Sequence, residues 1–361
     1  MMSMGFLHRT CGISTFAGVA PRVGMASLST GNIRSLPPTN SYDGIVCDMD
    51  GVLWRGREEI SRSIDALNVL KHRGKSIVFV TNSSSKTRSA IAQRLSALGY
   101  DANFSDIITS SSVTADFLYD ELIAKLILSS AAGKKNTTKV FMIGNSALKE
   151  ELEARNFEVL SVPDNSPVSL DEEELVDCQK SLVDDVKAVV VGVDQAFSFR
   201  KLSIGGLYLQ GGARKFVTTN PDNGNRLSSG AMHPETGSLA AALQSLSGIK
   251  PTVCGKPSRI IVEHVLKQLQ SRNPRRLLMV GDRLDTDIAF ANTARFSSCL
   301  VLSGVTTQEE AEEQMNGPSD TRKTPDFLAS DLWDMVSPVS IEDMRMLEES
   351  NKVRINSSPI V

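Results

Sequence analysis

Short apolar runs alternate with amphipathic segments along most of the chain. The runs Gly44–Cys47 and Ser76–Thr81 are apolar at nearly every position and predict strands, whereas Ser61–His72 and Thr87–Leu98 repeat apolar residues at helical spacing. Strands of this kind that are separated by helices are typical of a parallel sheet covered on both faces. The sequence therefore predicts an α/β fold, whose ligands bind beyond the carboxyl ends of the strands.

A second series of apolar runs interrupts the first pattern. Strands are predicted at Val140–Ile143, Lys187–Val191 and Lys215–Thr218, after which the first pattern resumes with a helix over Ser258–Gln270 and strands over Leu277–Val280 and Cys299–Leu302. The simplest arrangement is a Rossmann-like parallel-sheet core, residues 43–138 and 251–339, which carries an inserted α/β domain, residues 139–250.

Three further segments have the composition of connecting or terminal chain. The polar stretch Gly133–Thr138 and the acidic segment Asp171–Asp185 are expected to link elements rather than to form them. Residues 340–361 are polar and predict a loose tail.

The leader, residues 1–42, differs from the rest of the chain. It contains Arg9, Arg22 and Arg34 and ten Ser and Thr residues, and it has no acidic residue. This composition resembles a mitochondrial or chloroplast transit peptide, and it lacks the continuous apolar centre of a secretory signal. We therefore expect an organellar protein. A disordered leader on a cytoplasmic protein is the alternative.

Charge and cysteine content exclude several classes of partner. The formal net charge of −3 predicts no binding of nucleic acid or of an anionic membrane, and no apolar run reaches the roughly 20 residues needed to span a bilayer. The five cysteines are widely spaced and form no Cys-x-x-Cys motif, which favours free thiols over disulfides or a zinc site. Small molecules are the expected partners.

Two carboxylates, Asp48 and Asp50, follow the first predicted strand, and the chain turns at Gly51. Residues two positions apart lie on the same face of a strand, and the turn where the strand ends lets the two carboxylates converge on one site. Such a pair suits a divalent cation and a phosphate. A solvated turn after a strand is the alternative interpretation.

Three later segments offer complementary groups. Thr81-Asn82-Ser83 follows a strand with hydroxyl and amide donors, and Lys256 stands just before a predicted helix, whose amino end adds backbone donors. The run Gly281–Asp287 follows another strand and adds the carboxylates of Asp282 and Asp287. The Gly255-Lys256 segment is not a P-loop, because no glycine stands at the required spacing before it and Pro257 replaces the required Ser or Thr.

The order carboxylate pair, hydroxyl or amide, lysine, carboxylate resembles the haloacid dehalogenase superfamily of aspartate-nucleophile phosphatases, from about Tyr42 to Met335. The resemblance implies that Asp48 attacks phosphorus and binds Mg²⁺ through its other oxygen. Asp50 would act as general acid and base, and its backbone carbonyl would face the metal.

The same resemblance implies roles for the remaining site residues. Asp282 would be a direct Mg²⁺ ligand, and Asp287 would orient a water or Lys256. The phosphoryl oxygens would be bound by Thr81, Asn82, Ser83 and Lys256.

The position of the insertion resembles the type-two cap of the para-nitrophenyl phosphatase and phosphoglycolate phosphatase branch, which also includes pyridoxal phosphate phosphatases. A cap that closes over the site restricts the substrate to a small phosphorylated metabolite. The resemblance further implies a homodimer formed through the cap.

Substrate contacts are expected in the cap segment Asn220–Leu227, from Asn220, Asp222, Asn225 and Arg226. Asn225-Arg226-Leu227 looks more like the phosphoglycolate-hydrolysing members than the pyridoxal phosphate ones. Arg226 could pair with a substrate carboxylate, and a solvated loop residue is the alternative. Phosphoglycolate is therefore the expected substrate. A broad-specificity, pyridoxal phosphate or glycerol phosphate phosphatase is the alternative, and a non-catalytic phosphometabolite-binding protein is the alternative of another class.

Overall fold

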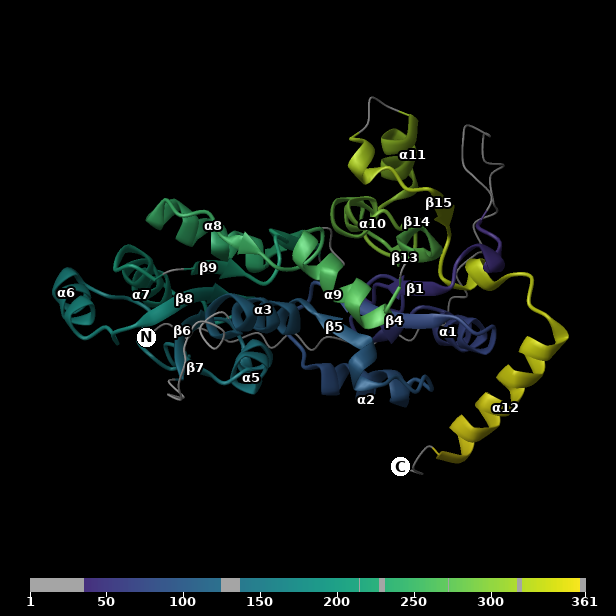
Figure 1. The fold of residues 1–361 in the computed structure, drawn as a ribbon, viewed down its shortest axis with the longest axis horizontal. Helices are drawn as coiled ribbons and strands as arrows, with labels where there is room; N and C mark the ends of the chain where they lie inside the picture. The colour runs from purple at the N-terminus through teal and green to yellow at the C-terminus, as the bar shows by residue number, and fades with distance from the viewer. Residues whose placement is uncertain are drawn as a thin grey trace, which may run out of the picture. The chain divides into compact units, whose positions relative to one another are not determined.

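The computed structural model describes residues 36–124, 137–213, 215–226, 231–271, 273–316 and 320–357. Most of the leader and the residues of the polar stretch 133–136 therefore lie outside the described residues. Within those residues the chain forms two parallel sheets, each accompanied by helices (Figure 1).

The first sheet has the order β15-β14-β13-β1-β4-β5, and all its neighbouring strands are parallel. Its strands are β1 Gly44–Cys47, β4 Ser76–Thr81, β5 Ile107–Thr109, β13 Leu277–Gly281, β14 Ser297–Val301 and β15 Phe327–Ala329. The helices of this core are α1 Ser63–His72, α2 Arg88–Ala97, α3 Ser110–Leu118, α9 Arg259–Leu269, α10 Ala289–Ala294, α11 Gln308–Asn316 and α12 Ile341–Ser357.

The second sheet has the order β12-β9-β8-β6-β7 and is also parallel. Its strands are β6 Thr138–Ile143, β7 Phe157–Leu160, β8 Val186–Val191, β9 Lys215–Thr218 and β12 Thr252–Val253, and its helices are α5 Ser146–Ala154, α6 Glu172–Lys180, α7 Phe199–Gln210 and α8 Thr236–Ser247. Because β12 pairs with β9, residues 252 and 253 belong to this sheet, although the expected core began at residue 251.

Short elements complete the fold. Two antiparallel hairpins pair β2 Trp54–Arg55 with β3 Glu58–Glu59 and β10 Gly224–Arg226 with β11 Met232–Pro234. The single turns of helix are η1 Thr39–Ser41, η2 Phe104–Asp106, η3 Tyr119–Ala124, η4 Pro274–Arg276, η5 Leu284–Ile288, η6 Thr321–Lys323 and η7 Trp333–Val336.

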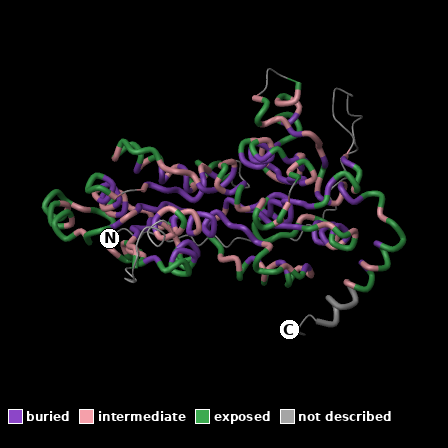
Figure 2. Tube along the Cα trace, in the orientation of Figure 1, coloured by how far each residue is buried: buried purple, intermediate pink, exposed green. Residues whose placement is uncertain are grey.

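Alternate residues of a strand pack into apolar clusters on opposite faces of the sheet. Ile45 and Cys47 of β1 pack with α1 and α2, whereas Val46 packs on the opposite face with α3 and α9. The second of these clusters also contains Val140 and Val190 of the second sheet, so one apolar cluster joins the two sheets. Most residues of the central strands of both sheets are buried, and exposed residues lie on the outward helix faces (Figure 2).

Two segments expected to lack regular structure are helical. Asp171 and Glu174 form a reciprocal capping box at the start of α6, which begins a helix with no buried residue of its own. The expected loose tail is wrong for its larger part. Helix α12 packs against α1, where Leu347 joins the core and Asp343 pairs with Arg73. No helix among the described residues combines the length and the apolar content that a bilayer crossing requires.

Candidate active site

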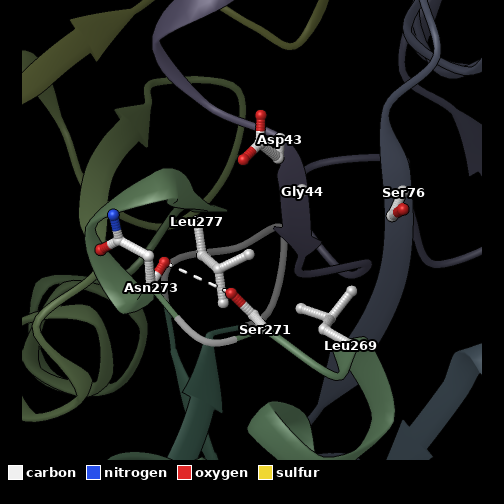
Figure 3. A pocket seen from close by; sticks show the side chains of 7 residues that line it. All are labelled: Asp43, Gly44, Ser76, Leu269, Ser271, Asn273 and Leu277. Carbon is white, nitrogen blue, oxygen red and sulfur yellow. Dashed lines mark hydrogen bonds between the residues drawn. The ribbon is translucent and has the colours of Figure 1, made fainter.

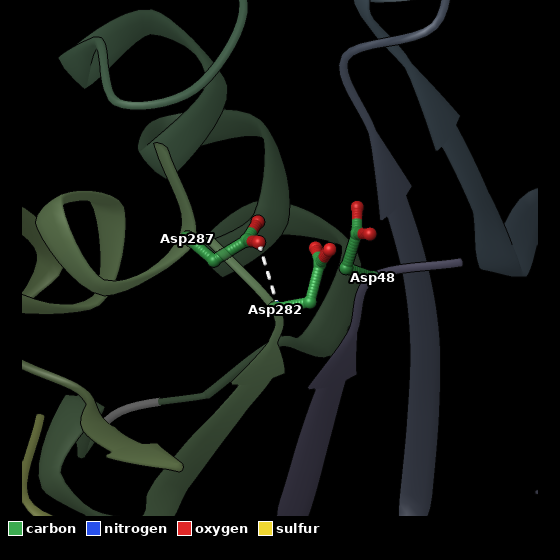
Figure 4. Close-up of side chains that lie close together, drawn as sticks. All are labelled: Asp48, Asp282 and Asp287. Carbon is green, nitrogen blue, oxygen red and sulfur yellow. Dashed lines mark hydrogen bonds between the residues drawn. The ribbon is translucent and has the colours of Figure 1, made fainter. Parts of the chain in front are cut away.

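The carboxyl ends of two adjacent strands bring three buried aspartates together. Asp48 follows β1, Asp282 follows β13, and Asp287 lies in the π-helical turn η5. One carboxylate oxygen of each residue lies within 4.8 Å of those of the other two (Figure 4). Since β1 and β13 are paired in parallel, their carboxyl ends lie at one edge of the sheet, and this places the cluster there.

Lys256 supplies the positive charge of this cluster. Its Nζ donates to Oδ1 of Asp48 at 2.5 Å, to Oδ1 of Asp287 at 2.6 Å and to the carbonyl of Val80 at 2.9 Å. An ammonium has three hydrogens, so these contacts use all of its donors. The side chain of Lys256 is almost completely buried and is held in a single position.

The buried cluster has more negative than positive charge. Three carboxylates against one ammonium leave a surplus of two negative charges when all are ionised. Burial raises the pKa of Asp48 well above its usual range; the charge of Lys256 opposes this, and the charges of Asp287 and Asp282 add to it. Burial, reinforced by Asp287, raises the pKa of Asp282 to about 7. A divalent cation would cancel the surplus.

Asp282 has the environment of a cation ligand. Its Oδ2 accepts the backbone N–H of Val305 at 2.7 Å, and a Cβ placed at Gly51 or Gly304 would lie 2.3 or 2.0 Å from this oxygen. Its Oδ1 is buried and has no hydrogen-bond partner among the described residues. Buried carboxylate oxygens are normally bonded, and hard cations such as Mg²⁺ prefer oxygen ligands, so the residues present fit such an ion.

Asp287 belongs to the cluster of three carboxylates, whereas the side chain of Asp50 lies outside it. Both oxygens of Asp287 are bonded, since Oδ1 accepts from Lys256 and Oδ2 accepts the backbone N–H groups of Asp282 and Arg283. Asp50 is exposed, and its side chain is not one of the three clustered carboxylates. The indole N–H of Trp54 donates to its Oδ1 at 3.0 Å and thereby orients it.

Thr81 and Asn82, at the carboxyl end of β4, make different contacts. Thr81 is buried, and its Oγ1 accepts the backbone N–H of Ser83 at 3.0 Å. The amide of Asn82, expected to bind phosphoryl oxygens, instead bonds the backbone of Lys256 on both sides: Oδ1 accepts its N–H at 2.7 Å and Nδ2 donates to its carbonyl at 3.1 Å. No local sequence signal marks this contact, because 174 positions separate the two residues.

The predicted specificity segment leads from β9 into the hairpin β10–β11. Asn220 is buried and donates to the carbonyl of Asn82 at 2.7 Å, and Asp222 accepts from Nδ2 of Asn82 at 3.3 Å. Asn225 is exposed on β10, and Arg226 lies on the same strand with its side chain outside the described part of the structure.

Beside this hairpin lies a cavity of about 400 Å³. Asp222 and Met232 line it from the hairpin side, and Arg283, Asp285 and Thr286 line it from η5 and the residue before it. Burial raises the pKa of Asp222, and the charge of Arg283 opposes that rise. In the sequence, Arg283 stands in the run Gly281–Asp287, between two of the predicted site carboxylates, and this position is the signal for it.

A second cavity, of about 300 Å³, lies at the opposite edge of the first sheet (Figure 3). Gly44, Ser76 and Leu277, the first residues of β1, β4 and β13, line it together with Asn273 and Leu269. Ligands of parallel sheets bind at the carboxyl ends, whereas this cavity lies at the amino ends, and it has no cluster of converging charges.

The first sheet holds a buried lysine between carboxylates at its carboxyl edge, and a second sheet is inserted into the chain, which defines an enzyme with a Rossmann-like core and an inserted cap. Family models agree: residues 45–158 match the haloacid dehalogenase-like hydrolases, and residues 253–335 match the HAD hydrolase-like family. The chain belongs to the haloacid dehalogenase-like hydrolases, in their type-two-capped branch of phosphatases, which confirms the resemblance drawn from the sequence.

Individual relatives cover most of the chain. It is 35% identical to the glycerol-3-phosphate phosphatase of Homo sapiens over 81% of this chain and 90% of that protein. It is 32% identical to the chloroplastic phosphoglycolate phosphatase 1A of Arabidopsis thaliana over 90% of this chain and 84% of that protein.

Solved structures extend the similarity to the fold. The p-nitrophenyl phosphatase of Archaeoglobus fulgidus is 27% identical with a TM-score of 0.65, and the match covers 82% of this chain and 98% of that one. The glycerol phosphate phosphatase of Mycobacterium tuberculosis, in complex with magnesium, is 26% identical with a TM-score of 0.64 over 82% of this chain and 77% of that one.

Proposed function

We propose that this protein is a Mg²⁺-dependent phosphomonoester hydrolase that acts through an aspartyl phosphate on Asp48, with 2-phosphoglycolate as its main substrate. The observation that carries the proposal is the contact of Lys256 with Asp48 and Asp287 beside an unpaired carboxylate oxygen of Asp282. This arrangement offers one nucleophilic oxygen and places positive charge where a phosphoryl group would arrive.

In the first half of the reaction, an oxygen of Asp48 forms a bond to phosphorus while the bond from phosphorus to the ester oxygen breaks. Asp50 gives its proton to the departing alkoxide, which leaves as an alcohol. Such a positioned acid contributes about 10² to 10⁴ in rate. The hydrogen bond from Trp54 holds the Asp50 carboxyl for this step.

In the second half, Asp50 takes a proton from a water whose oxygen attacks phosphorus, and the bond between Asp48 and phosphorus breaks. Inorganic phosphate leaves and both aspartates return to their starting states. Lys256, by giving up one of its three present hydrogen bonds, would hold the phosphoryl oxygens together with the hydroxyls of Thr81 and Ser83 and the backbone of Asn82.

Asp48 and Asp282, with the backbone carbonyl of Asp50, would hold Mg²⁺. Bound there, the ion would neutralise the repulsion between an anionic nucleophile and a phosphate dianion. Asp287 would keep Lys256 and the backbone of Asp282 in place.

The choice of phosphoglycolate rests on Arg226 and on the similarity to phosphoglycolate phosphatase 1A. Arg226 lies on β10 of the hairpin that borders the larger cavity, and an arginine can bind a substrate carboxylate through two parallel hydrogen bonds. Phosphoglycolate has such a carboxylate, whereas p-nitrophenyl phosphate does not.

Glycerol phosphate is the second candidate. The larger cavity is lined by two carboxylates, Asp222 and Asp285, and one guanidinium, Arg283. Carboxylates accept hydrogen bonds from hydroxyl groups and repel a substrate carboxylate, so this lining favours a leaving group rich in hydroxyls. The similarity to the human glycerol-3-phosphate phosphatase agrees with it.

The leading test is phosphate release across a panel of phosphomonoesters, with Mg²⁺ and with EDTA, for the wild type and Asp48→Asn. We expect Mg²⁺-dependent turnover that Asp48→Asn abolishes while its circular dichroism stays unchanged. Retained turnover in that variant would refute the nucleophile assignment. A protein that binds phosphoglycolate yet releases no phosphate would be a non-catalytic binder.

The substrate assignment is tested by Arg226→Ala. We expect kcat/KM to fall at least tenfold more for phosphoglycolate than for p-nitrophenyl phosphate, because only the former loses a paired carboxylate. An equal loss on both would remove the carboxylate role, and a higher wild-type kcat/KM for glycerol phosphate would favour the second candidate.

The finer statements about location and assembly are also proposals. The acid-free leader supports an organellar protein, which imaging of full-length and leader-deleted fusions would test. Dimerisation through the inserted domain would be tested by light scattering of the purified protein.

A further inference from the structure

We propose that Asp222 of the inserted domain is a positioning residue for Lys256, acting through the side chain of Asn82. The inference rests on the proposed function, because it concerns the same lysine. It adds that the cap segment fixes the geometry of the phosphate site in the core, in addition to any contact it makes with substrate.

The first link joins Asn82 to Lys256. Oδ1 of Asn82 accepts the backbone N–H of Lys256 at 2.7 Å, and its Nδ2 donates to the carbonyl of the same residue at 3.1 Å. Asparagine offers a donor and an acceptor in one plane, so it bonds this peptide backbone as a neighbouring strand would. The orientation of the Asn82 amide is set by these partners.

The second link joins Asn82 to the inserted domain. Its Nδ2 also lies 3.3 Å from both oxygens of Asp222, which face it as a charged acceptor. Asn220 donates to the carbonyl of Asn82 at 2.7 Å, so the same cap segment holds both the side chain and the backbone of this residue.

Close packing around Gly255 restricts the position of the loop that carries Lys256. A Cβ at Gly255, the residue before Lys256, would lie 2.6 Å from Oδ1 of Asn82 and 2.6 Å from the carbonyl of Thr219. The N–H of Gly255 donates to that carbonyl at 2.7 Å. The loop that carries Lys256 is therefore clamped between Asn82 and cap residues 219–222.

The position of the loop that carries Lys256 matters for the rate of the proposed reaction. The ammonium of Lys256 must reach both Asp48 and Asp287, and a shift of about 1 Å in a catalytic group can cost roughly 100-fold in rate. The segment 219–222 continues directly into the hairpin β10–β11 beside the larger cavity. A contact chain of Asp222, Asn82 and the backbone of Lys256 therefore joins the segment before the hairpin to the lysine.

The test compares Asp222→Asn with a matched control, Glu151→Gln. Glu151 makes a different contact between the inserted domain and the core, accepting from Arg88 at 2.8 and 2.7 Å, and it does not touch Asn82 or Lys256. Asn at position 222 keeps the shape but replaces one acceptor by a donor that faces Nδ2 of Asn82.

For Asp222→Asn we expect kcat to fall roughly 10- to 100-fold by the same factor on phosphoglycolate, glycerol phosphate and p-nitrophenyl phosphate, with KM changed less than threefold. Glu151→Gln should keep kcat within twofold. Unchanged kcat in Asp222→Asn, or a loss that differs strongly between leaving groups, would overturn the inference, because the latter is the signature of a substrate contact.

A second measurement does not depend on activity. In urea unfolding, the midpoint shifts of Asp222→Asn and Asn82→Ala should be non-additive in the double variant, whereas those of Glu151→Gln and Asn82→Ala should add. Additivity in both cycles would overturn the inference even in an active enzyme. Non-additivity in the first cycle without any phosphatase activity would retain the clamp and reject the proposed function.

Discussion

The Nζ of Lys256 lies 2.5 Å from Oδ1 of Asp48, although 208 positions separate the two residues in the sequence. The contact joins the loop before α9 to the end of β1 and places one cation among three buried carboxylates. The charges of Asp287 and Asp48 raise the pKa of Lys256 even though burial works against ionisation, so the lysine is charged at neutral pH.

Replacing Lys256 by an uncharged residue should strongly destabilise the fold. Lys256→Met leaves buried carboxylates without their counter-charge, and breaking a buried pair in this way costs about 3–5 kcal/mol. Urea unfolding measures the loss. The control is Lys149→Met, which breaks the exposed Lys149–Glu153 pair at 3.6 Å and should cost no more than about 0.5 kcal/mol. Equal losses for the two variants would contradict the buried-cluster account.

Gly51→Ala should disable the cation site through a collision with Asp282. Gly51 has φ +88° and Gly74 has φ +74°, so alanine costs about 1–2 kcal/mol of backbone strain at either position. A Cβ at Gly51 would meet Oδ2 of Asp282 at 2.3 Å, whereas nothing lies within 4 Å of one at Gly74. We expect phosphate release to fall at least about 100-fold in Gly51→Ala and to stay unchanged in Gly74→Ala. A similar activity in both variants would show that Asp282 can move without consequence.

Mg²⁺ should stabilise the wild type against unfolding through Asp282. An ion present at about 100 times its Kd adds about 2.7 kcal/mol to the unfolding free energy. Asp282→Asn should lose this gain, yet in EDTA at pH 8 it should be at least as stable as the wild type, because it removes one of several buried like charges. Thermal unfolding with and without Mg²⁺ measures both effects. Stabilisation of Asp282→Asn by Mg²⁺ to the wild-type extent would place the ion elsewhere.

The contact between α12 and α1 should weaken in acid. Burial opposes ionisation of Asp343, but hydrogen bonds from Arg73 and Ser340 outweigh it and lower its pKa to about 2. With an unfolded pKa near 3.8, the stabilisation is complete above about pH 4, falls as the pH drops from there towards 2, and is lost below that.

Asp343→Asn tests this assignment by urea unfolding between pH 6 and pH 2.5. The gap between wild type and variant should be widest at pH 6 and should shrink below pH 4. Asp320→Asn, which breaks a pair with the exposed Arg322, should shift the midpoint much less because water screens that pair. A gap for Asp343→Asn that does not change with pH would mean that its charge contributes nothing.

Much of the fold could be predicted because the signals that specify it are local. β1, β4 and β9 occupy the predicted residues, and the other predicted strands differ from the observed ones by one or two residues at an end. Helix α6 was missed since its start depends on the capping box of Asp171 and Glu174 and on no apolar stripe. Helix α12 was missed because its packing against α1 is a tertiary contact, which the polar composition of the segment does not reveal.

The candidate site was predictable in its residue types and only partly in its contacts. A strand end or helix start marks Asp48, Thr81, Lys256 and Asp282, and parallel strands carry such ends to one edge of a sheet. The direction of the Asn82 amide followed no local rule, because its partners lie in the loop of Lys256 and in the inserted domain.

By itself, the sequence determined the sheet-and-helix order, the insertion and the residue types of the candidate site, since periodicity and turn chemistry act over a few neighbouring positions. Only the tertiary structure decided that Asp287 shares Lys256 with Asp48, that Gly51 and Gly304 enclose Asp282, and that Asp222 is joined to the backbone of Lys256 through Asn82. These contacts join residues distant in the chain, and the packing of two sheets selects them.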